Sequence, residues 1–125
     1  MSKTRSKLID YANRESRTVR SFTTDIHFGR QAKHLPGQPN RDPTKSTITM
    51  PLPQLQDLLD PKAGTGHWHG ATKEVVDFGT VIGNYRDSGT GEEFATTWGT
   101  IHYSTKGAHV VPALPRTHTS HGSAG

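Results

Sequence analysis

The sequence predicts an α+β domain in which N-terminal helical segments pack on a small antiparallel β-sheet. Leucines at helical spacing occur in the first half of the chain. The second half consists of short β-branched and aromatic runs, which are separated by turn residues. Because helices come first and strands follow one another through turns, the strands are expected to pair antiparallel. A length of 125 residues fits one domain.

The first fifty residues predict one helix and two extended segments. A thin apolar side at helical spacing predicts a short helix over 4–16. β-branched and aromatic residues predict extended structure over 17–28 and a short strand over 46–50. Proline, glycine and asparagine between them predict a loop over 37–43.

The next helix has the clearest pattern. Pro51 and Pro53 suit its opening, and Pro61 is expected to end it. A Gly-rich loop is expected over 63–72. The helix presents four leucines to the core: Leu52, Leu55, Leu58 and Leu59.

The rest of the chain predicts a β-meander. Strand candidates lie at 75–78 and 81–85, and residues 87–91 form a strong turn. Residues 94–104 predict a strand pair or one bent strand, with a bulge or break at Gly99. A tight turn at 105–107 leads into a last strand over 108–112.

Charge and composition divide the chain into three parts. Residues 1–20 carry six basic and two acidic side chains, whereas residues 21–125 carry nine of each. We therefore expect a basic leader or linker at 1–20, a folded domain at 21–113 and a flexible tail at 114–125. A basic arm attracts phosphate backbones or acidic partners, and it also suits a solvated connector to an upstream segment.

Composition excludes several classes of site and segment. The chain has no cysteine, which rules out disulfides and thiolate metal sites. It has no apolar run of transmembrane length, and its start lacks the apolar region of a secretory signal. His67 and His69 have His-x-His spacing, and His118 and His121 have His-x-x-His spacing. Neither pair lies in a metal-binding motif, so we expect no metal and no cofactor.

Two further catalytic patterns fit poorly. The segment 63–66 resembles part of a Gly-rich phosphate loop, but it lacks the Gly-Lys-Ser/Thr sequence and a following helix. It can serve as a turn or as a substrate-facing loop in which Thr65 touches a phosphate. No Gly-x-Ser-x-Gly elbow is present for a serine nucleophile.

Metal-free RNA cleavage fits the inventory of polar residues best. Two histidines can take the proton of the 2′-hydroxyl and protonate the leaving oxygen. Lysine, serine and threonine supply cations and donors to the charged phosphate. Three short segments contain these residue types. The candidate catalytic residues are His34, Lys45, Ser46, Thr47, His102 and His109, and the candidate substrate-binding residues are Lys33, Thr65, Ser104 and Lys106.

Five motifs in order resemble the bacterial polymorphic toxin type 50 domain, over about residues 28–113. The first is Gln31-Ala32-Lys33-His34-Leu35-Pro36-Gly37, and the second is Lys45-Ser46-Thr47 followed by Pro51. Leu58-Leu59 with Ala63-Gly64-Thr65-Gly66, and Lys73-Glu74-Val75-Val76-Asp77-Phe78 with Ile82-Gly83, continue the match. The last runs from Ile101-His102-Tyr103-Ser104 through Gly107, His109, Val110 and Val111 to Pro112. His67-Trp68-His69, the first 20 residues and the tail after Arg116 fall outside the resemblance.

The resemblance implies a fold, an activity and partners. It implies the barnase–EndoU–colicin–RelE ribonuclease superfamily, with helices on a four- or five-stranded antiparallel sheet. It implies the C-terminal toxin of a larger secreted effector, such as a contact-dependent inhibition protein, which acts in the cytoplasm of a target bacterium. The implied substrate is RNA, often tRNA, and a cognate immunity protein is the implied partner.

The roles that we assign within the resemblance are hypotheses. His34 and His109 form the acid/base pair, Lys33 and Lys45 neutralise phosphate, and Ser46 or Thr47 donates to a phosphate oxygen. The near-neutral body makes electrostatic steering of RNA modest, so a host protein cofactor is a further candidate partner.

Two rival functions stay open on the residues alone. One is a catalytically inactive binding domain of the same fold in a phage or effector protein. The other is a metal-dependent DNase, which the lack of carboxylate clusters argues against.

Overall fold

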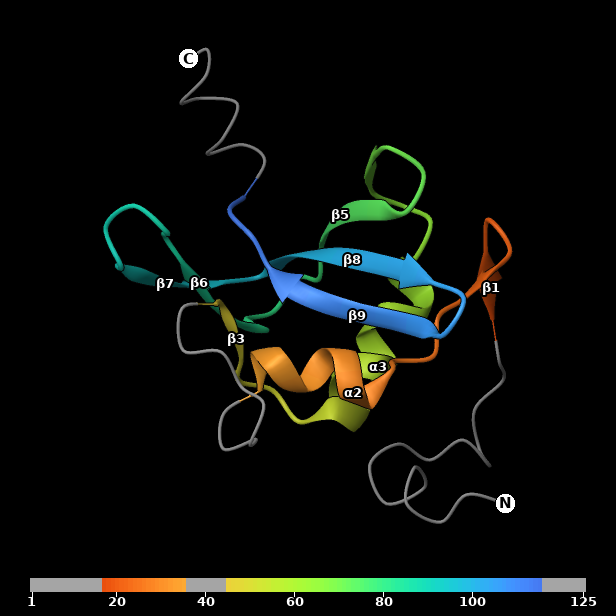
Figure 1. Cartoon of the computed structure of the whole chain (residues 1–125), viewed down its shortest axis with the longest axis horizontal. Coiled ribbons are helices and arrows are strands. Elements are labelled where there is room, and N and C mark those ends of the chain that lie inside the picture. Colours follow the sequence, from red (N-terminus) through yellow and green to blue (C-terminus); the bar gives the residue numbers. More distant parts are fainter. Residues whose placement is uncertain (1–16, 36–44, 116–125) are drawn as a thin grey trace.

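The computed structural model describes residues 17–35 and 45–115, and these form helices and antiparallel sheets in one α+β unit (Figure 1). The class of fold predicted from sequence is confirmed. The helix expected at 4–16, the loop at 37–43 and the end of the tail lie outside the described residues. The elements in chain order are β1 Thr18–Val19, β2 Phe22–Thr23, α2 Phe28–Gln31, the 3₁₀ helix η2 Ala32–His34, β3 Thr47–Ile48, α3 Leu52–Lys62, β4 His67–His69, β5 Lys73–Asp77, β6 Gly83–Arg86, β7 Glu93–Thr96, β8 Trp98–Ser104 and β9 Gly107–Pro112.

The largest sheet has four antiparallel strands in the order β4-β5-β8-β9. A three-stranded sheet β3-β6-β7 and the β1-β2 hairpin accompany it. Burial alternates along β8: Ile101 and Tyr103 are buried, whereas Thr100 and His102 are half-exposed. Because side chains alternate across a strand, the four-stranded sheet has one core face and one open face.

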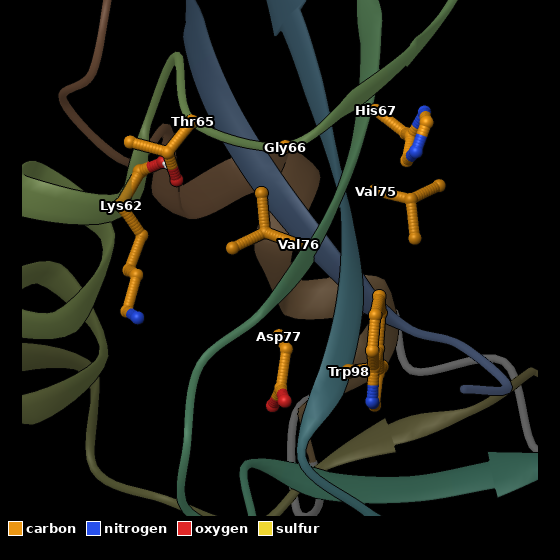
Figure 2. Close-up of a pocket in the computed structure, with 8 residues that line it drawn as sticks. All are labelled: Lys62, Thr65, Gly66, His67, Val75, Val76, Asp77 and Trp98. Atoms are coloured by element: carbon orange, nitrogen blue, oxygen red, sulfur yellow. Dashed lines mark hydrogen bonds between the residues drawn. The ribbon is translucent and has the colours of Figure 1, made fainter. Parts of the chain in front are cut away.

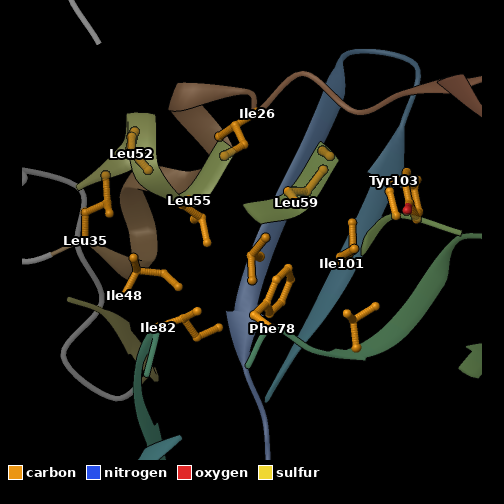
Figure 3. Close-up of a cluster of buried hydrophobic side chains, with 14 residues drawn as sticks. Ile26, Leu35, Ile48, Leu52, Leu55, Leu59, Phe78, Ile82, Ile101 and Tyr103 are labelled. Carbon is orange, nitrogen blue, oxygen red and sulfur yellow. The ribbon is translucent and has the colours of Figure 1, made fainter. Parts of the chain in front are cut away.

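Helix α3 covers the core face of the four-stranded sheet (Figure 3). Leu52, Leu55 and Leu59 are buried, and Leu58 packs at the margin, as the helical spacing predicts. The expected end at Pro61 is wrong by one residue, because the helix continues to Lys62. A proline removes one helical hydrogen bond, but the amide of Ala63 closes the last turn by donating to the carbonyl of Leu59 at 2.8 Å.

The extended structure expected over 17–28 is present in the hairpin β1-β2 and in the bridge at Ile26, and only Phe28, at the end of the range, begins a helix. The hairpin β1-β2 is tied to α3 because the Arg17 guanidinium donates to the carbonyls of Asp60 and Ala63. Helix α2 begins at Phe28, where the side chain of His27 accepts from the amide of Arg30 at 3.1 Å.

Residues 25–31 run along the outer edge of β9, and this placement positions the site (Figure 1). Ala108 donates to the carbonyl of Asp25 and accepts from the amide of His27, both at 2.8 Å. Further along, the amide side chain of Gln31 pairs with the backbone of Val110 in both directions. Its Oε1 accepts from Val110 N at 2.7 Å, and its Nε2 donates to Val110 O at 2.9 Å.

The region expected to be a Gly-rich loop over 63–72 contains strand β4. Glu74 is fully buried and fixes the start of this region. Its carboxylate accepts from the amides of Gly64 (2.9 Å) and Gly66 (2.6 Å) and from the hydroxyl of Tyr103 (2.7 Å). Trp68 then stacks on Tyr103, so the tryptophan of this strand has a packing role.

Gly99 does not break a strand, contrary to expectation. It lies inside β8, and the chain bends between β7 and β8 instead. A Cβ at Gly99 would lie 2.8 Å from Val110 Cγ1 and 2.9 Å from Ile82 Cδ1, so glycine is required here by core packing. The turns predicted at 87–91 and 105–107 are confirmed between β6 and β7 and between β8 and β9.

Candidate active site

Three histidine side chains from separate elements stack beside one another. His102 of β8 and His109 of β9 are a directly opposed pair in the antiparallel register, with ring centroids 4.7 Å apart. His34 of η2 stacks on His109 from the strand edge, with centroids 5.9 Å apart. We call His34, His102 and His109 the histidine cluster. The sequence proposed all three, and the structure brings them together.

The position of His34 follows from the contacts of the preceding residues. The bidentate pairing of Gln31 with Val110 fixes the end of α2 against β9. Helix η2 then continues for one turn and ends at His34, whose neighbour across the edge is His109. Val110 and His109 are consecutive. The contact of Gln31 with Val110 therefore also sets the distance between the rings of His34 and His109.

A hydrogen bond selects the tautomer of neutral His34. Its Nδ1 lies 3.0 Å from the carbonyl oxygen of Ser46. A carbonyl only accepts, so Nδ1 carries the proton and Nε2 holds the lone pair. The Ser46 hydroxyl accepts from the amide of Arg86 at 2.8 Å, and its own proton has no acceptor among residues 17–35 and 45–115.

Burial lowers the pKa of two members of the histidine cluster. Burial, followed by the charges of Lys73 and His34, lowers the pKa of His102 from 6.5 to about 4. Burial lowers the pKa of His109 to about 3, and nearby basic groups act in the same direction: His102, His34, Arg30 and Lys33. Both rings are therefore neutral at pH 7 and able to accept a proton.

The depressed pKa values predict a loss of stability in acid. Between pH 6.5 and about 3 the unfolded chain binds protons at His102 and His109 that the folded chain does not, so stability falls as the pH falls. After discounting for their partial exposure, we expect a loss of about 1–3 kcal/mol between pH 7 and pH 4. Denaturant unfolding at both pH values measures it, and the double variant His102→Asn/His109→Asn should lose this part of the dependence. An unchanged pH dependence in the double variant would contradict the assignment.

The surroundings of the histidine cluster are cationic. The charges of Arg30 and Lys33 lower the pKa of His109, and the charge of Lys73 lowers the pKa of His102. Within residues 17–35 and 45–115, no group of three or more His, Cys, Asp or Glu side chains is arranged to hold a metal ion. The rings of the cluster stack nearly parallel, at 16° and 18°. The arrangement suits an anion.

Lys45 and Thr47, two of the proposed residues, flank Ser46, whose carbonyl contacts the histidine cluster. Lys45 is exposed and directly precedes Ser46, whose carbonyl contacts His34. Thr47 is buried in β3, opposite Asn84 of β6.

Ser104 and Lys106 lie at the turn between β8 and β9. The Ser104 hydroxyl donates to the carbonyl of Gly107 at 2.9 Å and accepts from the amide of Lys106 at 3.2 Å. Its proton is thus used inside the turn, which gives Ser104 a structural role. The Lys106 side chain is exposed, and its contact with substrate stays a prediction.

Thr65 lies apart from the histidine cluster. Its hydroxyl donates to the carbonyl of Lys62 at 2.6 Å, just past the end of α3. It lines a hollow of about 350 Å³ where β5 leaves β4, together with Lys62, Gly66, His67, Val75, Val76, Asp77 and Trp98 (Figure 2). The hollow is on the β5 side of the sheet, whereas His109 and His34 are at the β9 edge.

Sequence reasoning missed Arg30 and Lys73 as cationic neighbours of the histidine cluster. Lys73 is opposite His102 in the β5-β8 register, and Arg30 lies on α2 beside β9. The only signal for Lys73 was the pairing of two strands distant in sequence, which no local pattern contains.

Comparison with known protein families identifies the family of the chain. A family described as bacterial toxin 50 matches residues 26–112, which include the whole histidine cluster. The chain belongs to the bacterial toxin 50 family. The resemblance noted in the sequence is confirmed, and the chain is a bacterial polymorphic toxin domain. No curated protein matches the chain.

The described part of this toxin 50 domain has no membrane-spanning helix. Its longest helix, α3, has 11 residues, and none in residues 17–35 and 45–115 is both long and apolar enough to cross a bilayer.

Proposed function

We propose that this toxin domain is a metal-independent endoribonuclease that cuts RNA, with tRNA as the first candidate. The observation that carries the proposal is the histidine cluster, two of whose rings are neutral at pH 7, surrounded by cations and by the Ser46 hydroxyl. Cleavage by the RNA's own 2′-hydroxyl requires a base, an acid and stabilisation of the charged phosphate, and these groups can supply all three.

In the proposed reaction, His109 and His34 act as the base and acid. A neutral imidazole takes the proton of the 2′-hydroxyl, and the 2′-oxygen forms a bond to phosphorus. The bond from phosphorus to the 5′-oxygen breaks, and a protonated imidazole gives its proton to that oxygen. The products are a 2′,3′-cyclic phosphate and a free 5′-hydroxyl. His109 is assigned as the base because its lowered pKa keeps its imidazole neutral at pH 7, and His34, whose Nδ1 is held by the Ser46 carbonyl, is then the acid.

The remaining residues stabilise the phosphate or modulate the pair. Lys33 and Lys45 are exposed near His109 and His34 and can neutralise phosphate charge. Ser46 or Thr47 can donate to a phosphate oxygen. His102 completes the stack and supplies a second neutral imidazole beside the base.

The fold supports the same proposal. Helix α3 covers one face of an antiparallel sheet, and the histidines of β8 and β9 lie on the other. This is the arrangement expected of a barnase–EndoU–colicin–RelE-like ribonuclease. We propose that the domain is delivered as the end of a larger effector and acts in the target cytoplasm, where a host protein can assist it. A cognate immunity protein that presents carboxylates to Lys33 and Lys45 would neutralise it.

The test is incubation of the purified domain with total bacterial RNA, with and without EDTA. Cleavage that persists in chelator, produces cyclic phosphate ends at discrete sites and is lost in His34→Ala is the expected result. Loss of cleavage on chelation would contradict the metal-free mechanism. Toxicity that His34→Ala leaves intact, in a folded protein without RNA cleavage, would favour a binding domain instead.

A further inference from the structure

The histidine cluster continues across the sheet as a row of basic side chains. His109 of β9 is opposite His102 of β8, His102 is opposite Lys73 of β5, and Lys73 is opposite His69 of β4. Residues directly opposite in antiparallel strands share one face, with Cβ atoms about 4.5–5.5 Å apart. The row therefore crosses all four strands on the open face, and His34 extends it beyond the β9 edge.

The half of the row on β4 and β5 is exposed, and Lys73 gives it a positive charge. Lys73 and His69 are both exposed, unlike the half-buried His102 and His109. Lys73 is close enough to His102 for its positive charge to lower the pKa of His102. In the described residues Lys73 makes no ion pair with a carboxylate. Glu74, its neighbour in sequence, points to the core and is fully buried.

Such a row suits a polyanionic chain better than a single small anion. One phosphate of a bound RNA strand would lie at His34 and His109, which stack on each other. The next phosphate of an RNA strand that runs along the row would meet Lys73 and His69. Lysine and histidine bind phosphate without reading bases, so this contact sets position and direction rather than sequence.

We propose that Lys73 and His69 form a second phosphate subsite, so that RNA lies across the sheet, perpendicular to its strands, with one phosphate at the histidine cluster and a neighbouring phosphate at β4 and β5. The proposal rests on the proposed ribonuclease function.

The subsite predicts a difference between short and long substrates. Lys73→Gln is expected to lower kcat/KM about two- to fivefold on an oligonucleotide with one cleavable site. It should leave a dinucleotide, which has a single phosphate, nearly unaffected. Measurement at pH 8 keeps His102 neutral in both proteins. The matched control is Lys62→Gln, which removes a lysine outside the row.

Binding provides a readout that does not depend on cleavage. With an oligonucleotide that has a 2′-deoxy sugar at the cleavage site, Lys73→Gln should weaken binding and reduce the slope of log K against log salt by about 0.7. His69→Ala should also weaken binding, whereas His67→Ala, an exposed histidine two residues away on the same strand, should not. An NMR titration of His102 should show its pKa rising towards 6.5 in Lys73→Gln, which checks that the two side chains are adjacent.

The outcomes separate the two proposals. If the wild type cleaves RNA but Lys73→Gln matches Lys62→Gln on both substrates and in binding, the subsite is wrong and the ribonuclease function stands. If the wild type binds the oligonucleotide in a Lys73-dependent way but cleaves no RNA, the subsite stands and the ribonuclease function is wrong.

Discussion

His109→Phe is expected to abolish RNA cleavage while leaving the domain at least as stable as the wild type. The Nδ1 atom of His109 is buried and, among the side chains of the described residues, has no hydrogen-bond partner. A buried polar atom left unpaired costs about 1–3 kcal/mol. Phenylalanine removes that atom and keeps a ring that can stack between His102 and His34. Loss of the base should lower the cleavage rate by about 10²–10⁴-fold.

Thermal unfolding and RNA cleavage, measured on the same protein samples, test this prediction. His67→Phe is the matched control, because it places phenylalanine at an exposed histidine of the same sheet without touching the histidine cluster. It should keep full activity. A His109→Phe protein that unfolds at a clearly lower temperature would show that Nδ1 has a partner in solution. One that cleaves RNA normally would remove His109 from the catalytic pair.

The sequence predicts those parts of the fold that local patterns specify. The leucine spacing of α3 and the turn residues at 87–91 depend only on neighbours in the chain, and the structure confirms both. Helix α2 has four residues, too few for helical periodicity, and its placement depends on a bond from Gln31 to Val110, 79 residues away. Strand β4 was missed because the glycines beside it suggested a loop, whereas the buried Glu74 holds that segment in place.

The same distinction applies to the site. Residue type alone marked His34, His102 and His109 as candidates, since few side chains transfer protons near neutral pH. The stacking of His102 on His109 follows from the register of the β8-β9 hairpin, which its turn sets locally. The stacking of His34 depends on the placement of α2 at the edge of β9, which no local pattern encodes. The hydroxyls show the opposite limit. Ser46 and Ser104 look alike as sequence candidates, but the Ser104 hydroxyl donates within a turn, whereas the Ser46 hydroxyl, among the described residues, only accepts from the Arg86 amide.

Gln31→Leu is expected to lower both stability and activity, because Gln31 connects the helix that carries His34 to the strand that carries His109. Gln31 is fully buried, and both hydrogen bonds of its side chain go to Val110. Leucine fills a similar volume but leaves the Val110 amide and carbonyl without these partners. We expect a loss of about 2–5 kcal/mol in the free energy of unfolding. Because η2 follows directly, His34 should also move relative to His109.

Gln54→Leu separates the positioning effect from a general effect of the substitution, since Gln54 is an exposed glutamine of α3. Activity should be compared well below the melting temperature of each protein, so that both are folded. There, Gln31→Leu should have a reduced kcat with little change in KM, because the RNA-binding cations remain while the acid and base are misaligned. A fully active, folded Gln31→Leu protein would mean that His34 holds its place through Ser46 alone. In that case the hydrogen bond from His34 Nδ1 to the Ser46 carbonyl would be the contact that positions the catalytic pair.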